Sequence, residues 1–303
     1  MVHDLSQIKA NKVSNTNLFS LNYNIKEIIM KEKSSSILFF IIGIMVVSIS
    51  EVFGQSSNDP ANHGNFFKVG IPIVHHQVKD ALIAPLRWAG IGSGLGLSYM
   101  STGPEVIHEV SLIMSVSGLK NRYKYTGYAL EVSLGYTFSC MVIPAVFGST
   151  IYLGPYIRWD GKTNFFKDWD DSHIYWFSTY EFGPSLKWSK DYKEKQNILF
   201  TMQLPFVALV SRPPENQYID QPPLIKPSYY FKSLNKDLRL VTLNNYFSFR
   251  LQADYSYQIK SGNMIGGSWL FDYKSCKLPR YTFLVTNTLM INYYKFFGKK
   301  QMK

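Results

Sequence analysis

The feature that most constrains this chain is a long, repeated two-residue alternation of apolar and polar side chains. The clearest run, 240–257, places Phe247 and Leu251 on one face and Arg250 and Asp254 on the other. Successive side chains of a β-strand point to opposite faces, so this alternation predicts strands with one apolar and one polar face. Several runs exceed the roughly 5–6 residues of a soluble strand and reach the roughly 9–11 residues of a tilted membrane-spanning strand.

The second constraint is the lack of a long apolar segment beyond the N-terminal region. After residue 56 no window holds the roughly 18 consecutive apolar residues of a spanning helix. Hydrocarbon offers no partner to backbone polar groups, and only helices and closed barrels satisfy their own backbone there. If the chain crosses a membrane, it must therefore do so as a closed barrel. A soluble secreted β-sandwich is the alternative for the same strand pattern.

We therefore predict an all-β fold, an antiparallel transmembrane up-and-down β-barrel of about ten strands, with eight strands as an alternative. The strands are expected at 66–74, 86–100, 105–117, 126–138, 150–159, 174–188, 196–209, 240–257, 264–274 and 281–297. Bacterial barrels keep both termini and short turns on the periplasmic side. The outer loops are then 75–85, 118–125, 160–173, 210–239 and 275–280. Inner turns are expected at 101–104, 139–149, 189–195 and 258–263.

The polar face of the predicted strands carries charges of both signs. Narrow barrels are filled by their own interior side chains. We expect these charged side chains to form a salt-bridged plug rather than to line a wide pore. The expected lumen residues are Glu109, Glu131, Arg158, Glu181, Lys187, Arg250 and Asp254.

Aromatic residues near strand ends predict interfacial girdles. Tyr and Trp favour the boundary between lipid and water, and barrels carry an aromatic belt at each side of the membrane. Trp88 and Tyr99 lie near the ends of one predicted strand, and Trp176 and Trp188 near the ends of another. We expect these four side chains to mark the two interfaces.

Glycines at alternate positions of 86–100 occupy one face of that strand: Gly90, Gly92, Gly94 and Gly96. Glycine weakens a strand unless its missing side chain serves a purpose. One interpretation is that the stripe leaves room in the lumen for bulky side chains from the opposite wall. The other is a kink or strong coil of the strand itself.

The N-terminal region has the order of a signal peptide. The apolar run 37–49 is too short for a comfortable span, follows Lys31 and Lys33, and precedes a small-residue cleavage pattern that ends at Gly54. We expect export to the outer membrane by a cleaved signal peptide at 30–54, with an uncleaved inner-membrane anchor as the alternative. The remaining predicted divisions are a mis-annotated or disordered extension at 1–29, a periplasmic leader at 55–65, a barrel at 66–297 and a basic tail at 298–303.

Four features of the sequence carry a family resemblance. They are the signal ending in Val52-Phe53-Gly54-Gln55, the glycine-rich first long strand, the alternating Tyr-rich strands, and the final strand closing in Tyr293-Tyr294-Lys295-Phe296-Phe297. Over about 56–303 the chain resembles small outer-membrane β-barrel proteins of the Bacteroidetes type. The resemblance implies outer-membrane lipid, lipopolysaccharide and the barrel-assembly machinery as partners. In many such proteins a terminal aromatic is read during assembly, and here six residues follow Phe297.

Two predicted outer loops hold the candidates for chemistry. His75 and His76 lie in loop 75–85, and Asp170 and His173 in loop 160–173, where an Asp–His pair can activate water. In the same loop Asp168, Asp170 and Asp171 are candidate cation ligands, although His173 occupies the position that an EF-hand loop reserves for glycine. A solvated polar loop is the simpler explanation of these residues. No cofactor is expected.

The formal net charge of +11 is compatible with anionic lipid or an anionic solute, and no nucleic-acid motif accompanies it. The function that these observations favour is a non-enzymatic outer-membrane barrel, structural or a narrow diffusion channel for a small solute. One alternative is a surface enzyme or a ligand or cation binder that uses loops 75–85 and 160–173. Another is a soluble secreted β-sandwich binding protein.

Overall fold

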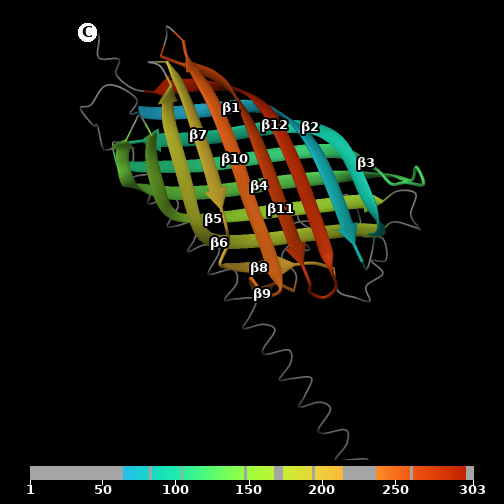
Figure 1. Cartoon of the computed structure of the whole chain (residues 1–303). Coiled ribbons are helices and arrows are strands. Elements are labelled where there is room, and N and C mark those ends of the chain that lie inside the picture. The colour runs from blue at the N-terminus through green and yellow to red at the C-terminus, as the bar shows by residue number, and fades with distance from the viewer. Residues whose placement is uncertain are drawn as a thin grey trace, which may run out of the picture. The chain divides into compact units, whose positions relative to one another are not determined.

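The computed structural model describes residues 64–81, 84–103, 105–146, 149–166, 173–192, 195–213, 237–259 and 262–297. The regular structure in these residues is β-strand throughout (Figure 1). In them no helix has the length and apolar character needed to cross a membrane. The strands are β1 (Gly64–Asp80), β2 (Ala84–Thr102), β3 (Val106–Lys120), β4 (Thr126–Val146), β5 (Ser149–Phe166), β6 (His173–Tyr192), β7 (Gln196–Gln203), β8 (Val207–Ser211), β9 (Arg239–Thr242), β10 (Tyr246–Gln258), β11 (Met264–Cys276) and β12 (Thr282–Phe297).

The predicted extension 1–29, the signal peptide 30–54 and the tail 298–303 lie outside the described residues, as does the leader up to residue 63. These divisions, including the cleavage before Gln55, stay predictions.

The strands form one sheet that closes on itself. The hydrogen-bonded order is β5-β4-β3-β2-β1-β12-β11-β10-β7-β6-β8-β9, and a further pairing of β5 with β6 completes the circle. Segments β7 and β8 both pair with β6, while β10 pairs with β7 and β9 with β8. Segments β7 and β8 are therefore two parts of one wall strand, and β9 and β10 are two parts of the next. The barrel has ten antiparallel strands. The predicted up-and-down barrel is confirmed, and the eight-strand and sandwich alternatives are wrong.

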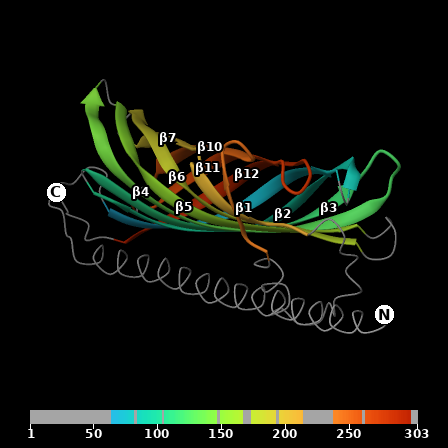
Figure 2. The ribbon, with the colours of Figure 1, turned by 90° about the horizontal axis from the view of Figure 1, so that it is seen from below.

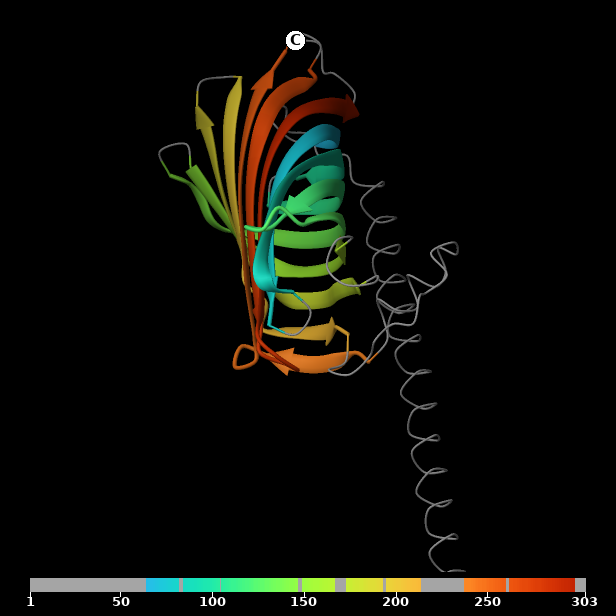
Figure 3. The ribbon, with the colours of Figure 1, turned by 90° about the vertical axis from the view of Figure 1, so that its right-hand side faces the viewer.

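The two walls of the barrel cross each other at a steep angle. Figure 1 shows β10, β11 and β12 running across β4, β5 and β6, which lie behind them. The same strands appear from below in Figure 2, and in profile in Figure 3, where the orange strands form one wall and the green strands the other. Strong tilt is what a closed sheet of few strands requires. Side chains from both walls consequently meet in the lumen.

The barrel has a loop end and a termini end. At the loop end, β1 joins β2, β3 joins β4, β5 joins β6, β8 joins β9 and β11 joins β12. At the termini end lie the start of β1, the end of β12 and the other connections. Several strands run further than the sequence pattern predicted. Strand β1 continues to Asp80, into the predicted loop 75–85, and β4 continues to Val146, into the predicted turn 139–149.

Pro72 does not end β1, contrary to the short strand 66–74 that the sequence suggested. The pairing of β1 with β12 is continuous through Pro72, which lies opposite Met290. The pairing with β2 instead skips Ile71 and Pro72. Proline has no N–H to donate, so one ladder is interrupted while the other holds the strand in place.

Another proline accounts for the break between β7 and β8, which the sequence pattern treated as one strand at 196–209. Leu204 and Phe206 still donate backbone N–H groups to Pro184 and Phe182 of β6, at 3.3 and 2.9 Å. Pro205, which lies between them, cannot donate, and the neighbouring strand turns at 243–245. The predicted strand 240–257 is consequently split into β9 and β10.

The exterior of the barrel is apolar. Ile71 and Ile73 of β1, Ile91 of β2, and Leu289 and Ile291 of β12 are exposed, Ile291 to 80%. Those of β1 and β12 alternate with buried residues along their strands. A contiguous apolar surface of this kind is not stable in water, whereas lipid solvates it. The barrel is a transmembrane β-barrel.

The glycine stripe follows the second of its two predicted explanations. A Cβ atom added to Gly90 would lie 1.6 Å from the carbonyl oxygen of Gly118, and one at Gly92 would lie 2.0 Å from that of Val116. At Gly90, Gly92 and Gly94 the nearest obstructing atom is a backbone carbonyl oxygen of the neighbouring strand β3, whereas at Gly96 it is the side chain of Met290 on β12. The stripe therefore allows β2 to coil tightly against β3 at a corner of the barrel.

Candidate functional site

The middle of the lumen is filled by eight charged side chains, called here the interior network. Each side chain is less than one-tenth exposed. They come from β4, β5, β6, β10 and β11, and four are cationic and four anionic. The interior network consists of Glu131, Arg158, Asp160, Lys162, Glu181, Arg250, Asp272 and Lys274.

Arg158 is the hub on the β5 wall. Its Nε atom lies 2.8 Å from Asp160 Oδ2, and its Nη2 atom donates to Glu181 Oε2 on β6. Strand β5 pairs with β6 at this level, since Arg158 is opposite Glu181 in the register. The guanidinium forms several bonds at once because its donors form a rigid planar fork, which a lysine ammonium does not offer.

Lys274 and Arg250 connect this wall to the opposite one. The Nζ atom of Lys274 on β11 lies 2.8 Å from Glu181 Oε1 and also pairs with Asp160. Arg250 Nη2 on β10 lies 3.1 Å from Asp272 Oδ2 and 3.4 Å from Asp160 Oδ1. Strand β5 pairs with neither β10 nor β11. The pairs that Lys274 and Arg250 form with Asp160 therefore cross the lumen and obstruct it, whereas Arg250 and Asp272 are opposite each other on the paired strands β10 and β11.

Lys162 extends the interior network toward β4 and β12. Its Nζ atom lies 3.0 Å from Glu131 Oε1 and donates to Thr286 Oγ1 at 2.9 Å. His76 reaches the same place from β1, with Nδ1 3.8 Å from Glu131 Oε2 and 3.3 Å from Thr286 Oγ1. Through Thr286 and His76, the contacts of the interior network extend to β12 and β1.

Toward the loop end, the lumen is closed by an apolar cluster instead. The rings of Trp88 and Phe166 contact each other at a tilt of 39°, with their centroids 4.5 Å apart. All members are buried, and they come from every part of the barrel wall. The apolar cluster consists of Val78, Trp88, Leu119, Ala129, Phe166, Tyr175, Phe177, Ala208, Val210, Val241, Tyr246, Cys276 and Leu284.

Toward the termini end, two separate ion pairs fill the lumen. Lys68 Nζ lies 2.7 Å from Asp254 Oδ1 and 3.0 Å from Ser268 Oγ. Lys187 Nζ lies 2.6 Å from Glu109 Oε2. The lumen therefore has three layers: the apolar cluster, the interior network and these two pairs.

All seven predicted lumen residues lie in the two charged layers. Glu131, Arg158, Glu181 and Arg250 belong to the interior network, and Glu109, Lys187 and Asp254 to the pairs near the termini. Sequence reasoning missed Lys68, Asp160, Lys162, Asp272 and Lys274. Asp160 and Lys162 fell in the predicted loop 160–173. Had β5 been extended to its true end, their positions two and four residues after Arg158 would have placed them inside.

Two of the predicted interface aromatics, Trp88 and Trp176, are buried. Trp88 is fully buried in the apolar cluster, because it shares the inward parity of Gly90. Trp176 is buried as well, and its indole N–H donates to Ser211 Oγ at 3.3 Å. Side-chain direction, rather than position near a strand end, decides where the Trp88 ring lies. Tyr99 and Trp188 are partly exposed, and their interfacial role stays a prediction.

The candidates for catalysis do not come together as predicted. His75 and His76 lie in β1, not in a loop, and adjacent strand residues point to opposite faces. His76 is buried in the lumen, while the partly exposed His75 lies 3.4 Å from the Gln77 amide. His173 begins β6. The acids of the same predicted loop, Asp168, Asp170 and Asp171, lie outside the described residues. Within the described part of the chain, no group of three or more His, Cys, Asp or Glu side chains is placed to hold a metal ion.

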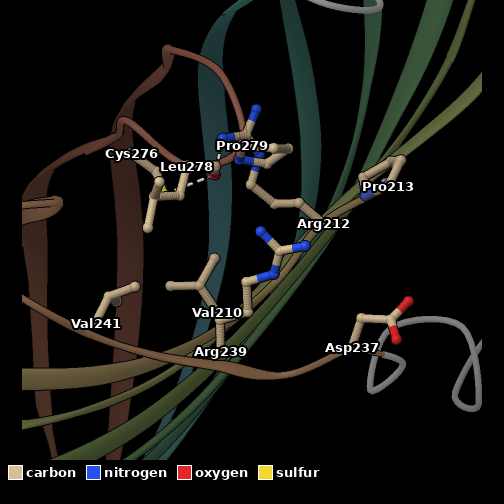
Figure 4. A pocket seen from close by; sticks show the side chains of 9 residues that line it. All are labelled: Val210, Arg212, Pro213, Asp237, Arg239, Val241, Cys276, Leu278 and Pro279. Carbon is tan, nitrogen blue, oxygen red and sulfur yellow. Dashed lines mark hydrogen bonds between the residues drawn. The ribbon is translucent and has the colours of Figure 1, made fainter. Parts of the chain in front are cut away.

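One small pocket opens at the loop end (Figure 4). Its volume is about 20 Å³, room for about one water molecule. The side chain of Arg212 lines the pocket. Its guanidinium donates to the carbonyl oxygens of Leu278 and Arg280 at 2.6 and 2.7 Å and pairs with Asp80. Cys276 Sγ lies 3.3 Å from the same Leu278 carbonyl. These bonds fasten the β11–β12 connection to the barrel and leave no room for a solute.

No protein-family model matches the chain, and no curated protein does. Among solved structures it is similar to the β domain of the Bordetella autotransporter BrkA, at 10% identity over 76% of this chain and 98% of that one, with a TM-score of 0.38. It is also similar to a TodX deltaS2S3 mutant monoaromatic hydrocarbon channel, at 8% identity over 79% and 93%, with a TM-score of 0.32. The outer membrane protein OprG from Pseudomonas aeruginosa matches at 10% identity over 79% and 100%, with a TM-score of 0.31.

TM-scores this low carry no inference about what the chain does. The barrel assignment rests on the closed sheet and its apolar exterior. The resemblance to the Bacteroidetes type stays a prediction.

Proposed function

We propose that the protein is a non-enzymatic β-barrel of a bacterial outer membrane, plugged in its resting state. It serves as a structural barrel, or as a narrow channel that passes small solutes only when the plug rearranges. The observation that carries the proposal is the interior network, whose ion pairs join β5 and β6 to β10 and β11 across the lumen.

The energetics of the interior network favour a closed state. Four cations and four anions balance one another, so the layer has no formal net charge. A solute of either sign would have to separate buried pairs, and leaving one buried charge without its partner costs roughly 3–5 kcal/mol. The apolar cluster adds a second barrier, since an ion entering it would lose its water among mostly apolar side chains.

The outer membrane is proposed for physical reasons. Closed barrels with an apolar exterior band and strands connected in simple succession are the architecture of outer-membrane proteins. The exposed Ile71, Ile91 and Ile291 supply that exterior. The even number of wall strands puts both ends of the barrel sequence on one side.

Conductance across a planar lipid bilayer tests the plug. The wild-type barrel is expected to show no steady conductance above that of the bare bilayer. The double variant Asp160→Ala/Lys274→Ala removes one cation and one anion together, so the remaining charges stay balanced while the lumen gains space. It is expected to conduct.

The matched control is Lys190→Ala/Asp191→Ala, which removes an opposite pair of charges near the termini end of β6, where Asp191 is exposed. It should remain as silent as the wild type. A wild-type barrel that conducts as well as the lumen variant would show that the network is no plug.

A further inference from the structure

The described rim residues carry an uneven distribution of exposed charge, although the interior network is balanced. At the loop end the exposed cations are Lys79, Arg87, Lys120, Arg122, Lys124, Arg239, Lys277 and Arg280. Among the described residues of that end, one acid is exposed, Asp237, which precedes β9. At the termini end, the described exposed charges include Lys195 and Lys295 and the acids Glu105 and Asp191. The basic excess of this part of the chain is therefore concentrated at one rim.

Five of these cations lie side by side on the β1–β4 wall and are called here the basic rim: Lys79, Arg87, Lys120, Arg122 and Lys124. The register brings them together, because Gln77 of β1 is opposite Ala89 of β2, which is opposite Lys120 of β3. Arg87 Nη2 donates to Gln77 Oε1 on the neighbouring strand. Lys79 follows Gln77 on the same outward face.

The β3–β4 turn holds the last two members in place. Asn121 Oδ1 accepts the backbone N–H groups of Tyr123 and Tyr125, at 2.9 and 3.1 Å. The Arg122 guanidinium lies over the Tyr123 ring, 4.6 Å from its centroid. Tyr123 and Tyr125 are exposed beside it. Arginine and tyrosine together at the edge of a transmembrane segment suit the headgroup layer of a lipid leaflet.

The level of the basic rim is set by the apolar exterior below it. On the same wall, Ile73, Ile91, Val116 and Tyr128 are exposed and face lipid. The cations begin where this band ends. A cation at that height is within reach of lipid phosphate groups, and the guanidinium of Arg87 or Arg122 can bind such a group with two hydrogen bonds.

We infer that the basic rim binds the phosphate groups of an anionic lipid in the leaflet that surrounds the loop end. The charges are complementary, because the cations of the basic rim face outward at the height of anionic lipid phosphate groups. At that height the surrounding lipid, rather than a soluble partner, is adjacent to them. If the loop end faces outward, the side on which outer-membrane barrels have their longer connections, as the long connection 212–238 indicates, that lipid is the phosphorylated glycolipid of the outer leaflet, lipopolysaccharide. The inference rests on the proposed membrane location of the barrel.

The test measures the binding of purified lipid A to the full-length protein in neutral detergent by native mass spectrometry. Three proteins are compared: the wild type, the rim variant Lys79→Gln/Arg87→Gln/Lys120→Gln, and a matched control, Lys190→Gln/Lys195→Gln/Lys295→Gln, with the same loss of charge at the termini end. Each lysine or arginine near an anionic surface contributes enough that losing three should weaken binding by roughly 100-fold. The control should bind as the wild type does.

Two further probes separate the lipid from other phosphate sources. Dephosphorylated lipid A should bind the wild type no better than it binds the rim variant, and inorganic phosphate should not compete with lipid A. Equal loss of binding in the rim variant and the control would overturn the inference, as would competition by inorganic phosphate. Heat-modifiable gel mobility and insertion into zwitterionic vesicles are measured on the same samples. If these fail, the membrane location is wrong, whereas intact insertion without lipid A selectivity rejects the basic rim alone.

Discussion

Two layers of one lumen solve the same packing problem with opposite chemistry. The apolar cluster fills the loop end with side chains such as Trp88, Phe166 and Leu284, whose contacts are numerous and individually weak. The interior network fills the middle with few, directional ion pairs, each dependent on a partner from another strand. The cluster should therefore tolerate change gradually, whereas the network responds to the loss of a single member as a unit.

The largest expected effect is the removal of one charge from the network. Asp160→Ala leaves Lys274, Arg250 and Arg158 without the carboxylate that all three contact. We expect a loss of roughly 3–5 kcal/mol in the free energy of unfolding, measured by urea titration in lipid vesicles. The double variant Asp160→Ala/Lys274→Ala should be less destabilised than the sum of its two single variants. Strict additivity would show that the network does not act as a unit.

The next effect is a cavity in the apolar cluster. Leu284 is fully buried on β12, and Leu284→Ala removes its contacts without leaving a polar group behind. The expected cost is roughly 2–5 kcal/mol, with the value set by how far the cluster collapses. The volume-conserving Leu284→Met should cost less than about 1.5 kcal/mol. If both substitutions cost the same in urea titration, the cluster is not packed as described.

The stability cost of a conservative substitution can be compared between the two layers. Arg158→Lys preserves the cation but loses the planar fork that contacts Asp160 and donates a hydrogen bond to Glu181. We expect a loss of roughly 1.5–3 kcal/mol, the usual worth of a hydrogen bond to a charged group. Leu284→Met, the conservative change in the other layer, should cost less. The reverse order would mean that electrostatic balance matters more than bond geometry in this lumen.

The difference between the layers also explains what the sequence could predict. Alternation identified the ten wall strands, and the inward parity of Arg158, Glu181 and Arg250 placed them in the lumen, because both properties are local. Which cation meets which anion depends on the tilt and stagger of facing walls, so the pairing of Lys274 with Asp160 over 114 residues had no local signal. Strand ends were likewise underestimated. Asp160, Lys162 and His76 lie on strand extensions where the pattern is less regular, and the sequence pattern placed them in loops.

Trp88 shows a further limit of what the sequence pattern could predict. Aromatic character near a strand end fits both a membrane girdle and a lumen cap, and composition alone does not distinguish them. Parity does, because Trp88 shares its face with Gly90 and Gly92, which bend β2 inward at the corner.

The break at Pro205 was predictable in principle, since a proline in a central strand removes a ladder hydrogen bond.

The smallest expected effect compares the two faces of one strand with the same substitution. Leu284 and Leu289 both lie on β12, but Leu284 faces the apolar cluster and Leu289 is 60% exposed on the lipid side. Leu284→Ile changes the side-chain shape inside a packed layer and should cost up to about 1.5 kcal/mol. Leu289→Ile should leave the urea midpoint unchanged in a bilayer, because fluid acyl chains adjust to either isomer. The two variants have the same composition and nearly the same position along the chain, so any difference between them reports the facing direction alone. Equal effects would mean that Leu289 packs against protein and that the exterior of β12 is not a lipid-facing surface.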